Sequence, residues 1–426
     1  FFAFSAFSSV ANKKEGVIIN KIGRNRFMIP ISRAIKIIES QALAIGFEHV
    51  DIGDAAGRVL AENIVADTDL PPFDRSQMDG FAVIARDTRD APVALKIVGE
   101  SAAGSGWHHK MKSGEAVRIM TGAPVPKGAD AVQKTELTSE ERVDERVLIR
   151  EPAERRKFIV PKGFEVKKGE TVFSKGEVVS DMMIASLAAF GYARVKVGQS
   201  PRVAILATGS EIVPVDKRPG RDQIRNSNSV ALKVLVERAG AVAKTFPIAK
   251  DDISALTKQI GRAASSSDIV IVTGGVSVGK YDLTKAALRE LGAEIVFERV
   301  RLRPGKPTVF AKLGDTLFFG LPGNPVSAAV TFLLFVRTAI MKMQGAIECE
   351  LVGGQAILPA AAKGAKERDT YLPATLKTDK AGSLLAKPLR WHGSSDLIGF
   401  ARAQALIFVP RGKTLEARTV VNILYL

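Results

Sequence analysis

The spacing of apolar positions changes along the chain, and each change predicts a different kind of structure. Over residues 32–43 these positions recur at roughly helical spacing, which predicts an amphipathic helix. Between residues 51 and 165 short β-branched runs alternate with glycine and proline, as is typical of a β-rich region. A second helix is predicted next, with Ser180 as its N-cap and Gly191 just past its end. The β-rich stretch is therefore predicted to be an insertion into a helical domain.

After Pro201 strands and helices alternate regularly. Strands are predicted at 203–207, 241–246, 268–273 and 295–297, with helices at 229–238, 253–264 and 283–291. This alternation predicts a parallel sheet with helices on both faces, and such sheets bind ligands at the carboxyl ends of their strands. A hairpin through Gly314-Asp315 and a closing helix at 325–343 follow.

Short strands return after residue 346, with turn signals near three glycines, and predict a small β-barrel or sandwich. The predicted division is a leading segment, 1–28; a split helical, dimerising domain, 29–58 plus 163–198; a β-rich insertion, 59–162; an α/β domain, 199–345; and a β-rich tail, 346–426. In the leading segment an apolar run precedes the basic residues, the reverse of a secretory signal, so a disordered extension is predicted there.

Composition narrows the class of protein. The chain has 426 residues, 46% hydrophobic and 25% charged, which predicts a globular protein of roughly three domains. No run of eighteen apolar residues lacks both charge and glycine, so a soluble protein without membrane contact is expected. One cysteine and four scattered histidines exclude an internal disulfide and disfavour a zinc site or histidine catalysis. A reducing, cytoplasmic location fits this composition.

The net charge of +16 favours anionic partners such as phosphorylated cofactors, oxyanions, nucleic acid or a membrane surface. Charge alone does not choose among them, and a basic surface that only aids solubility is an equal alternative. Aromatic residues make up 6%, and the common nucleic-acid-binding signatures are missing, so a nucleic-acid partner is not expected.

Four turns rich in glycine, serine and threonine follow predicted strands of the α/β domain. They span residues 208–211, 273–279, 303–307 and 320–327. Backbone N–H groups in such turns form concave anion sites because no Cβ blocks the approach. Each turn alone is better explained as structural, but four at one edge favour phosphate binding. None matches the P-loop or the dinucleotide fingerprint.

Charged residues beside these turns have two interpretations each. Arg303 and Lys306 flank a Pro-Gly step, which would hold two cations for a dianion such as molybdate or phosphate, or is simply a solvated basic turn. Asp282 either caps the following helix or faces the ligand as an acceptor or metal ligand. The pair Asp251-Asp252 offers the same choice between cap and acid.

Two polar loops of the β-rich insertion could also carry chemistry. Residues 72–81 place Asp74 and Asp79 in a segment too irregular for a helix or strand, and Thr121 begins a second such loop. Carboxylates among so many cations could hold Mg²⁺, which takes oxygen ligands and bridges phosphate groups. Turn-forming aspartates explain these positions equally well.

Five motifs in register resemble those of one family. They are PFDRSQMDGFAV at 72–83, RIMTGAP at 118–124, TGGVSVG at 273–279, PGKP at 304–307 and GLPGNPVS at 320–327. Together they resemble the MoeA family of molybdenum-cofactor biosynthesis, from about residue 31 to the C-terminus. The resemblance implies a multidomain α/β and β fold: a central molybdopterin-binding α/β domain with a parallel or mixed sheet, a split helical domain with a β-rich insertion, and a C-terminal β-barrel.

The activity that the resemblance implies is that of a molybdopterin molybdenumtransferase. The family takes adenylylated molybdopterin and molybdate, releases AMP, and places molybdenum on the dithiolene sulfurs in a Mg²⁺-dependent step. It implies an elongated homodimer whose site combines the α/β domain of one subunit with the insertion of the other. The adenylyltransferase that makes the substrate is a candidate partner.

The motif matches carry the family's functional residues onto positions of this chain. Catalytic residues would be Asp74, Thr121, Glu211, Asp282 and Lys306, and Mg²⁺ would be held by Asp74, Glu165 and Asp282. Substrate and anion would contact Gly274, Gly275, Ser277, Arg303, Pro307, Gly323, Asn324, Ser327, Arg368 and Ser394, the alignment being loose for Arg368 and Ser394. Arg303 stands where many members have lysine, and Glu165 where others carry aspartate.

Three other functions are alternatives to the transferase: an adenylyltransferase, a scaffold and a nucleic-acid binder. An adenylyltransferase on the same α/β fold would make the adenylate, but such proteins usually lack the insertion and the β-rich tail. A scaffold like the homologous module of gephyrin would cluster membrane receptors, and no receptor-binding groove is evident in the sequence. A basic nucleic-acid binder would show a steep salt dependence of binding.

Overall fold

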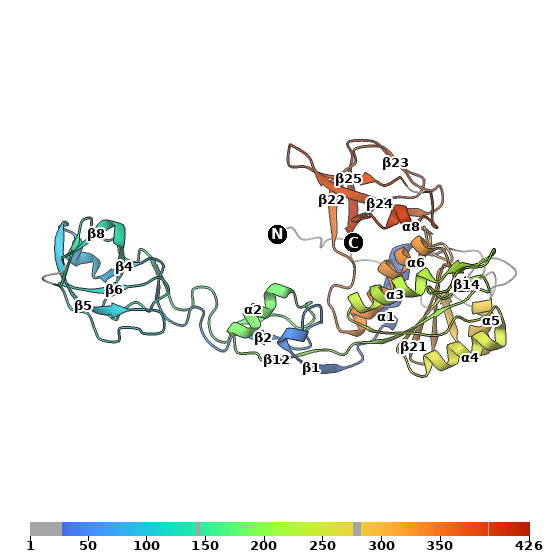
Figure 1. The fold of residues 1–426 in the computed structure, drawn as a ribbon, viewed down its shortest axis with the longest axis horizontal. Helices are drawn as coiled ribbons and strands as arrows, with labels where there is room; N and C mark the ends of the chain where they lie inside the picture. Colours follow the sequence, from blue (N-terminus) through green and yellow to red (C-terminus); the bar gives the residue numbers. More distant parts are fainter. Residues whose placement is uncertain (1–27, 142–144, 276–282, 391) are drawn as a thin grey trace, which may run out of the picture. The chain divides into compact units, whose positions relative to one another are not determined.

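The computed structural model describes residues 28–141, 145–275, 283–390 and 392–426. The prediction of a disordered extension over 1–28 therefore lies, except for Met28, outside the described residues. The described chain forms two compact units (Figure 1). Unit 1 comprises residues 28–45, Ser200–Gln344 and Cys349–Leu426, and unit 2 comprises Gly46–Gln199 and Gly345–Glu348. The domain boundaries expected from the sequence stay a prediction.

A six-stranded sheet forms the centre of unit 1. Its order is β16 (Val242–Thr245), β13 (Arg202–Ala207), β17 (Ile269–Thr273), β21 (Thr316–Leu321), β20 (Val309–Leu313) and β18 (Glu294–Phe297). The first four strands pair in parallel, and β20 runs antiparallel to both of its neighbours. The sheet is mixed because β20 and β21 form the hairpin predicted at Gly314-Asp315.

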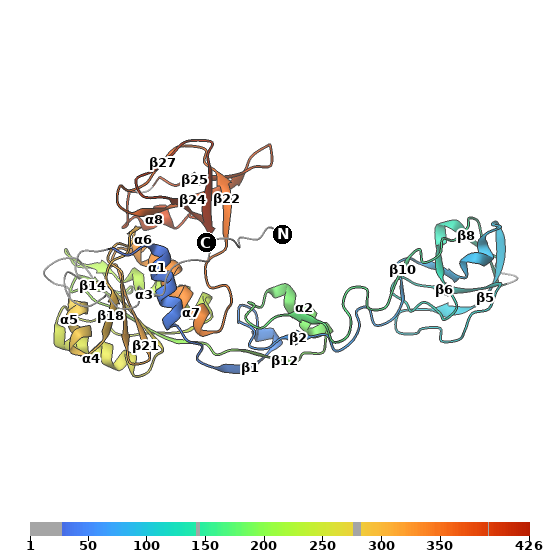
Figure 2. The same ribbon diagram turned by 180° about the vertical axis from the view of Figure 1, so that it is seen from behind.

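Helices cover both faces of this sheet (Figure 2). They are α3 (Ser227–Arg238), α4 (Ile253–Ala264) and α5 (Leu283–Glu290). Successive residues of a strand point to opposite faces. Along β13, Val203 and Ile205 accordingly share a core with α3, whereas Ala204 and Leu206 share one with α4 and α5. The strand order reverses between β13 and β17, and their carboxyl ends are where such folds bind ligands.

One long helical stretch closes the sheet. It consists of α6 (Pro325–Thr331), the π-helical segment η4 (Phe332–Val336) and α7 (Arg337–Met343). Within the described ranges it alone is long and apolar enough to cross a membrane, but 78% of its apolar window is buried inside the protein. It is therefore a core helix, as its many apolar residues in the largest core cluster also indicate.

Helix α1 (Ile31–Gln41) packs against this closing stretch. The apolar stripe of Ala34, Ile35 and Ile38 is buried in the same core as α7. The buried stripe of this helix lies in unit 1, and the expected grouping of the helix with residues 163–198 stays a prediction. Helical spacing predicts that one face of the helix is buried, but it does not predict which element packs against that face.

The tail of the chain forms a closed β-barrel. The strands β24 (Asp369–Thr378), β25 (Leu384–Pro388), β22 (Gly353–Ile357), β28 (Val420–Tyr425) and β26 (Ala405–Val409) pair in that order, and β26 pairs back with β24. Strand β19 (Leu302–Arg303), which precedes the barrel in sequence, adds to β24 in parallel. Short elements complete unit 1: β14 (Ile212–Val213) with β15 (Ile224–Arg225), β23 (Ala362–Lys363) with β27 (Thr414–Leu415), and α8 (Leu397–Phe400).

Unit 2 contains the predicted β-rich region as a second six-stranded sheet. Its order is β7 (Ala131–Lys134), β4 (Gly80–Val83), β6 (Glu115–Ile119), β5 (Val93–Ser101), β9 (Arg146–Ile149) and β8 (Thr138–Glu141). The turns η1 (Ile52–Asp54), η2 (Ala85–Thr88) and η3 (Thr135–Leu137) belong to the same unit. Phe81 and Val83 face one core cluster, and Ala82 faces another, so both sides of the sheet are covered.

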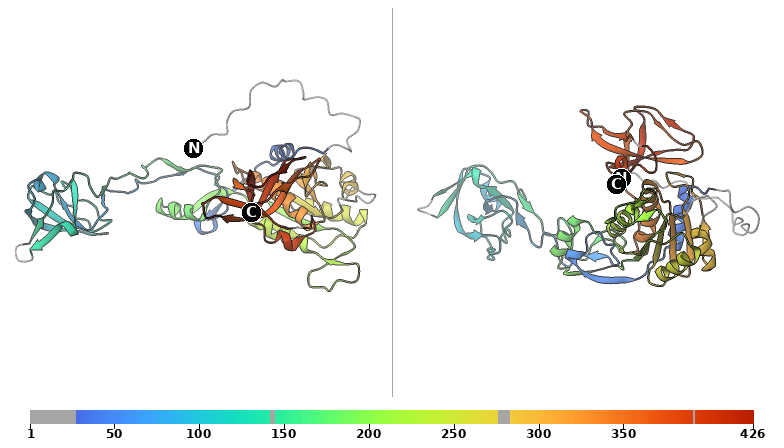
Figure 3. Two further views of the ribbon diagram at one scale, coloured as in Figure 1. Left: turned by 90° about the horizontal axis from the view of Figure 1, so that it is seen from above. Right: turned by 45° about the vertical axis from the view of Figure 1, so that its right-hand side comes forward.

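Two chain segments lead into and out of this sheet side by side (Figure 3). They pair as β2 (Ile64–Val65) with β11 (Thr171–Phe173), at a bridge between Leu70 and Val166, and as β3 (Arg75–Ser76) with β10 (Ile159–Val160). Farther from the sheet, β1 (Phe47–Asp51) pairs with β12 (Arg194–Gly198). Helix α2 (Asp181–Ala189) is capped by Ser180, and Gly191 beyond its end has a φ of +76°, as predicted.

Candidate active site

Two of the predicted glycine turns meet at the carboxyl ends of β17 and β21. Asn228, in the first turn of α3, donates from Nδ2 to Thr273 Oγ1 and to the carbonyl oxygen of Gly323, both at 2.8 Å. Thr273 donates in turn to the carbonyl oxygen of Pro322 at 3.2 Å. A Cβ on Gly323 would lie 3.6 Å from Gly274 Cα. One asparagine side chain thus ties the two turns together.

The sequence did not single out Asn228 as a site residue. Its local signal is modest, an Asn-Ser-Asn run at 226–228 before a predicted helix, and this reads as an N-cap. Asn226 does cap α3, accepting from the Ser229 N–H at 3.1 Å. The second asparagine, whose partners lie 45 and 95 residues away, acts through tertiary contacts that local spacing does not reveal.

The glycines at 274 and 275 are required by both backbone and space. Their φ angles are +92° and +63°. A Cβ on Gly274 would lie 2.3 Å from the carbonyl oxygen of Thr208, and one on Gly275 would lie 2.9 Å from Thr284 Oγ1. The Thr284 hydroxyl is buried and lacks a hydrogen-bond partner among the described residues. The rest of this turn, including the predicted Ser277 and Asp282, lies outside the described residues.

The first glycine turn already holds a carboxylate of the same chain. Asp251 accepts from the backbone N–H and the hydroxyl of Ser210, both at 3.0 Å, and from the Thr208 hydroxyl at 3.3 Å. The turn is therefore less suited to binding an anion than its composition suggests, because the Ser210 N–H and the hydroxyls of Ser210 and Thr208 already donate to Asp251. Asp252 caps α4 through the Ala255 N–H at 2.7 Å. The cap interpretation thus holds for Asp252 alone.

Glu211 lies at the same turn. It is exposed, and a Cβ on Gly209 would lie 2.6 Å from one of its carboxylate oxygens. Gly209 has a φ of +148°, so glycine suits this position for its backbone as well. The predicted acid therefore lies beside the carboxyl end of β13.

The turn at 303–307 lies on the closing helix and beside the barrel. A Cβ on Gly305, where φ is +119°, would lie 2.5 Å from Thr331 Cγ2. Arg303 is exposed and pairs through its backbone with Thr370 of β24. Lys306 and Pro307 are half-buried. The predicted cations are thus placed where the α/β part meets the barrel within unit 1.

Arg368 belongs to the same cationic region. Burial, and after it the positive charge of Arg303, lower the pKa of Arg368, and Glu367 partly opposes this. A guanidinium remains protonated at neutral pH. Two arginines that repel one another across β19 and the start of β24 therefore favour an anion between or beside them.

The first turn of α6 contacts a loop of the barrel. Asn324 donates from Nδ2 to Ser394 Oγ at 2.7 Å, and the Val326 N–H donates to the carbonyl oxygen of Ser394 at 3.1 Å. Ser327, in the same turn, is 3% exposed. Asp396 caps α8, and the backbone N–H groups of Gly399 and His392 lower the pKa of its carboxyl. The structure thus brings Asn324 together with Ser394, a position that the alignment placed only loosely.

In unit 2 the two predicted polar loops are joined by their backbones. The Gly122 N–H donates to the carbonyl oxygen of Ser76 at 2.8 Å, and the Ser76 N–H donates to that of Ala123 at 3.0 Å. The Val125 N–H donates to the carbonyl oxygen of Asp74 at 2.8 Å. The loops that carry Asp74 and Thr121 therefore form one surface of this unit.

The acids on that surface differ in what they bind. Asp79 accepts from the Thr121 N–H at 2.6 Å, and this bond, with the Thr121 hydroxyl, lowers the pKa of Asp79. Asp74 accepts from the Lys162 N–H at 2.7 Å through Oδ1, and Glu165 pairs with Arg75 at 3.3 Å. Asp74 and Glu165 are both exposed. Asp79 positions Thr121, and the other two acids keep oxygen atoms open to ligands.

Within the part of the chain that the structure describes, no three or more His, Cys, Asp or Glu side chains form a group that could hold a metal ion. Of the predicted Mg²⁺ ligands, Asp74 and Glu165 lie in unit 2, whereas Asp282 is outside the described residues. Two exposed carboxylates supply the oxygen donors that Mg²⁺ prefers, and phosphate oxygens commonly complete such a site.

Comparison with known proteins identifies the family. Three family models match in order: "MoeA N-terminal region (domain I and II)" at 29–191, "Probable molybdopterin binding domain" at 204–342, and "MoeA C-terminal region (domain IV)" at 355–426. A molybdopterin molybdenumtransferase of Staphylococcus aureus (strain COL) is 36% identical over 388 residues, which cover 90% of this chain and 92% of the relative. This chain belongs to the MoeA family. The transferase of Staphylococcus epidermidis RP62A is 33% identical over 404 residues, covering 94% and 96%.

Solved structures agree with this assignment to the MoeA family. A crystal structure of the molybdopterin biosynthesis moeA protein from Pyrococcus horikoshii OT3 superposes with a TM-score of 0.79 at 30% identity, covering 94% of this chain and all of the other. A second structure of a moeA protein from this species gives a TM-score of 0.74 at 32% identity, covering 94% and 99%. The multidomain fold expected from the motifs is confirmed, whereas the roles of the individual site residues stay predictions.

Proposed function

We propose that this chain is a molybdopterin molybdenumtransferase that acts in molybdenum-cofactor biosynthesis. The similarity to proteins of that name over nine-tenths of both chains supports this activity. The observation on the molecule that carries the proposal is the cationic region of unit 1, where Arg303, inside the domain that matches the molybdopterin-binding model, lies near Arg368. Such a region fits an oxyanion substrate.

The proposed substrates are adenylylated molybdopterin and molybdate. An oxygen of molybdate attacks the adenylate phosphorus and the phosphoanhydride bond breaks, which gives molybdopterin phosphate and an AMP–molybdate anhydride. AMP leaves with the bridging oxygen when a dithiolene sulfur displaces that oxygen from molybdenum. The dithiolene sulfurs then replace oxygen ligands of molybdenum, and the departing oxygen takes up two protons to leave as water. An aspartate or glutamate of the site would supply protons for this departure.

The residues of unit 1 would bind the anions. Lys306 and the two arginines would neutralise phosphate or molybdate charge, and Asn324 with Ser394 would offer hydrogen bonds at the start of α6. The backbone of Gly274, Gly275 and Gly323 would let phosphate approach closely, since side chains there would clash or strain the turn. Glu211 would lie at the same strand ends.

The residues of unit 2 would act on the phosphoanhydride. Asp74 and Glu165 would hold Mg²⁺, which supplies positive charge to phosphate oxygens when it is bound. Thr121, positioned by Asp79, would hydrogen-bond the substrate. A homodimer in the cytoplasm, supplied with the adenylate by an upstream adenylyltransferase, is the setting that we propose for this reaction.

The test is release of AMP from adenylylated molybdopterin by the full chain with Mg²⁺, with and without molybdate. AMP should appear only with molybdate, and Asp74→Asn, which keeps an acceptor for the Lys162 N–H, should slow its release at least tenfold. Asp181→Asn, an exposed acid in the first turn of α2, is the matched control and should retain the rate. AMP formation without molybdate would contradict the molybdate-dependent step, and binding of the adenylate with no AMP release at all would contradict the transferase and favour a scaffold.

A further inference from the structure

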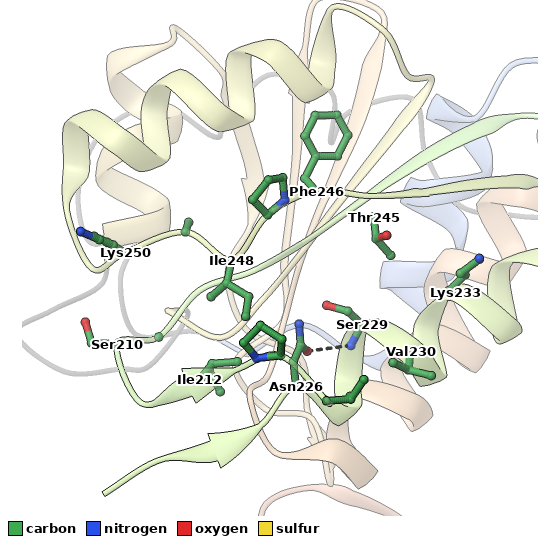
Figure 4. A pocket seen from close by; sticks show the side chains of 15 residues that line it. Ser210, Ile212, Asn226, Ser229, Val230, Lys233, Thr245, Phe246, Ile248 and Lys250 are labelled. Carbon is green, nitrogen blue, oxygen red and sulfur yellow. Dashed lines mark hydrogen bonds between the residues drawn. The ribbon is translucent and has the colours of Figure 1, made fainter. Parts of the chain in front are cut away.

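Two surfaces of unit 1 differ in their chemistry. The cavity beside the first glycine turn has mainly apolar walls, which include Ile212, Val230 and Ile248 (Figure 4). It adjoins the strand ends to which the proposed function assigns the substrate. The C-terminal barrel instead presents a cluster of cations that the proposed reaction does not use.

This cluster, the barrel basic surface, comes from two segments that meet where β23 pairs with β27. Lys363 belongs to β23 and Lys366 follows it, whereas Arg411 and Lys413 precede β27. All four residues are exposed. The barrel basic surface consists of these four residues.

Backbone contacts hold the two segments together. The Gly364 N–H donates to the carbonyl oxygen of Lys413 at 3.0 Å, and the Gly412 N–H donates to that of Ala365 at 2.8 Å. A Cβ on Gly364 would lie 3.0 Å from the carbonyl oxygens of Lys413 and Pro410. The four cations therefore extend from a fixed backbone, and a preorganised surface loses less entropy when it binds a partner.

The nearby acids do not neutralise these cations. Asp369 is half-buried, and its Oδ1 accepts the Arg411 N–H at 3.0 Å. Glu367 is exposed and forms no ion pair within the described ranges. Among the described residues of the barrel, the one ion pair is that of His392 with Asp396. The side chains of the barrel basic surface therefore remain open to an anionic partner.

The charge of the whole barrel points the same way. Residues 351–426 contain eleven lysines and arginines but five aspartates and glutamates. Arg368 follows Lys366 in the chain, and the positive charge of Arg303 acts on it, so the barrel basic surface continues the cationic region of unit 1. A charge excess of this kind attracts anions over a distance of about 10 Å at moderate salt.

The composition of the two segments favours one class of polyanion. Residues 361–369 and 410–416 contain no aromatic side chain, and single-stranded nucleic acid is usually bound by stacking of bases on aromatic rings. Neither segment contains an exposed large apolar side chain that could insert into a bilayer. Carboxylates along a polypeptide need only complementary cations. An acidic protein segment therefore fits this surface better than nucleic acid or a membrane does.

We propose that the barrel basic surface binds an acidic segment of a partner protein, rich in aspartate and glutamate. The four cations contact its carboxylates, and the complex forms quickly and weakens as salt screens the charges. The inference does not depend on the proposed function, because none of these four residues is assigned to the reaction.

The probe is a fluorescent peptide of twelve glutamates, whose binding to the full chain is measured by fluorescence anisotropy. The fourfold variant carries Lys363→Gln, Lys366→Gln, Arg411→Gln and Lys413→Gln. The matched control also removes three lysines and one arginine from exposed positions of the barrel: Lys377→Gln, Lys380→Gln, Lys387→Gln and Arg402→Gln. Lys377 lies near the opposite end of β24 from Asp369, and Lys387 lies on the neighbouring strand β25.

The fourfold variant should weaken peptide binding at least tenfold, and the matched control less than threefold. A third variant keeps the charge with Lys363→Arg, Lys366→Arg and Lys413→Arg, and it should bind the peptide within twofold of the wild type. This third variant separates loss of charge from a disturbed fold. The proposal is overturned if the third variant loses binding, if the matched control loses as much as the fourfold variant, or if the wild type does not bind the peptide at low salt.

Two further probes test the other polyanions. They are a single-stranded oligonucleotide of twelve thymidines and vesicles that contain phosphatidylserine. The fourfold variant should lose affinity for the glutamate peptide by a larger factor than for either of these probes. A larger loss for the oligonucleotide or for the vesicles would assign the surface to that polyanion and overturn the proposal.

Discussion

At the scale of single residues, the chemistry of this protein depends on charges that are left uncompensated. Burial lowers the pKa of Arg368, and the positive charge of a second guanidinium, that of Arg303, lowers this pKa further. Repulsion of this kind destabilises the chain without ligand and favours binding of a dianion. Removal of the Arg368 charge should therefore weaken the binding of a dianion and raise the stability of the chain without ligand.

Arg368→Gln should raise the dissociation constant for molybdate about tenfold, equivalent to about 1.4 kcal/mol. The thermal midpoint should stay level or rise, because the repulsion with Arg303 is relieved. Calorimetric titration and thermal unfolding measure the two effects. Lys380→Gln removes an equal charge from an exposed position of the barrel and should change neither quantity. A lower midpoint with unaltered molybdate binding would contradict this assignment.

Asp79 has a structural role with a defined pH dependence. Its pKa is lowered in the folded chain by the bonds to Thr121, so its contribution to stability is complete above the unfolded value of about 3.9 and is lost as the pH falls through the folded pKa. Asp79→Asn should therefore be less stable than the wild type at pH 6, and the difference should shrink at pH 3. Denaturant midpoints at the two pH values measure this, and a difference that is constant with pH would contradict it.

Residue chemistry was only partly predictable. Local composition identified Asp74 and the basic turn at 303–307 as candidates, because loops rich in charge need no distant partner to be recognised, and their roles stay predictions. Asn228 was missed, because its bonds to Thr273 and Gly323 exist only once segments far apart in sequence meet. The hydrogen bonds that Asp251 accepts from the first glycine turn could not be predicted for the same reason.

At the scale of elements, predictions succeeded where the signal is local. The cap at Ser180 and the hairpin at Gly314-Asp315 follow from residues next to one another, and of the two roles left open for Asp252 the structure shows the cap. The five-residue π-helical segment inside the closing helix has no such signal, since its sequence Phe332–Val336 is uniformly apolar. The packing partner of α1 likewise depends on the whole core and not on its own spacing.

The glycine turn after β17 offers a test at this scale. Gly274→Ala should destabilise the chain by at least about 3 kcal/mol, because strain at positive φ adds to a Cβ placed 2.3 Å from the carbonyl oxygen of Thr208. Gly292→Ala, also at positive φ but with open space around its Cβ, should cost only about 1 kcal/mol. Denaturant unfolding compares them, and equal costs would show that the close approach does not matter.

At the scale of the whole molecule, the order of the α/β and β-rich regions along the chain was predictable, whereas the contacts between these regions were not. Alternating strands and helices, then a β-rich tail, follow from the period of the apolar residues. The contact between Asn324 and Ser394 joins positions 70 residues apart, and the addition of β19 to β24 joins the α/β part to the barrel. The basic excess of the chain suggested an anionic partner, but only the fold shows which cations lie at strand ends.

The paired segments that connect the β-rich sheet to the rest of unit 2 have a consequence for how this chain can be cut and rejoined. Because the incoming and outgoing strands run as neighbours, the first and last residues of the inserted sheet are close together, held by the pairing of β3 with β10 and of β2 with β11. For the rest of unit 2, the roughly one hundred intervening residues are equivalent to one long loop whose two ends are paired. The entropy cost of closing a loop grows only slowly with its length. The inserted sheet is thus a module that can be lengthened, exchanged or removed at this one pair of connecting strands. The sheet and the rest of unit 2 would each keep their own hydrophobic core.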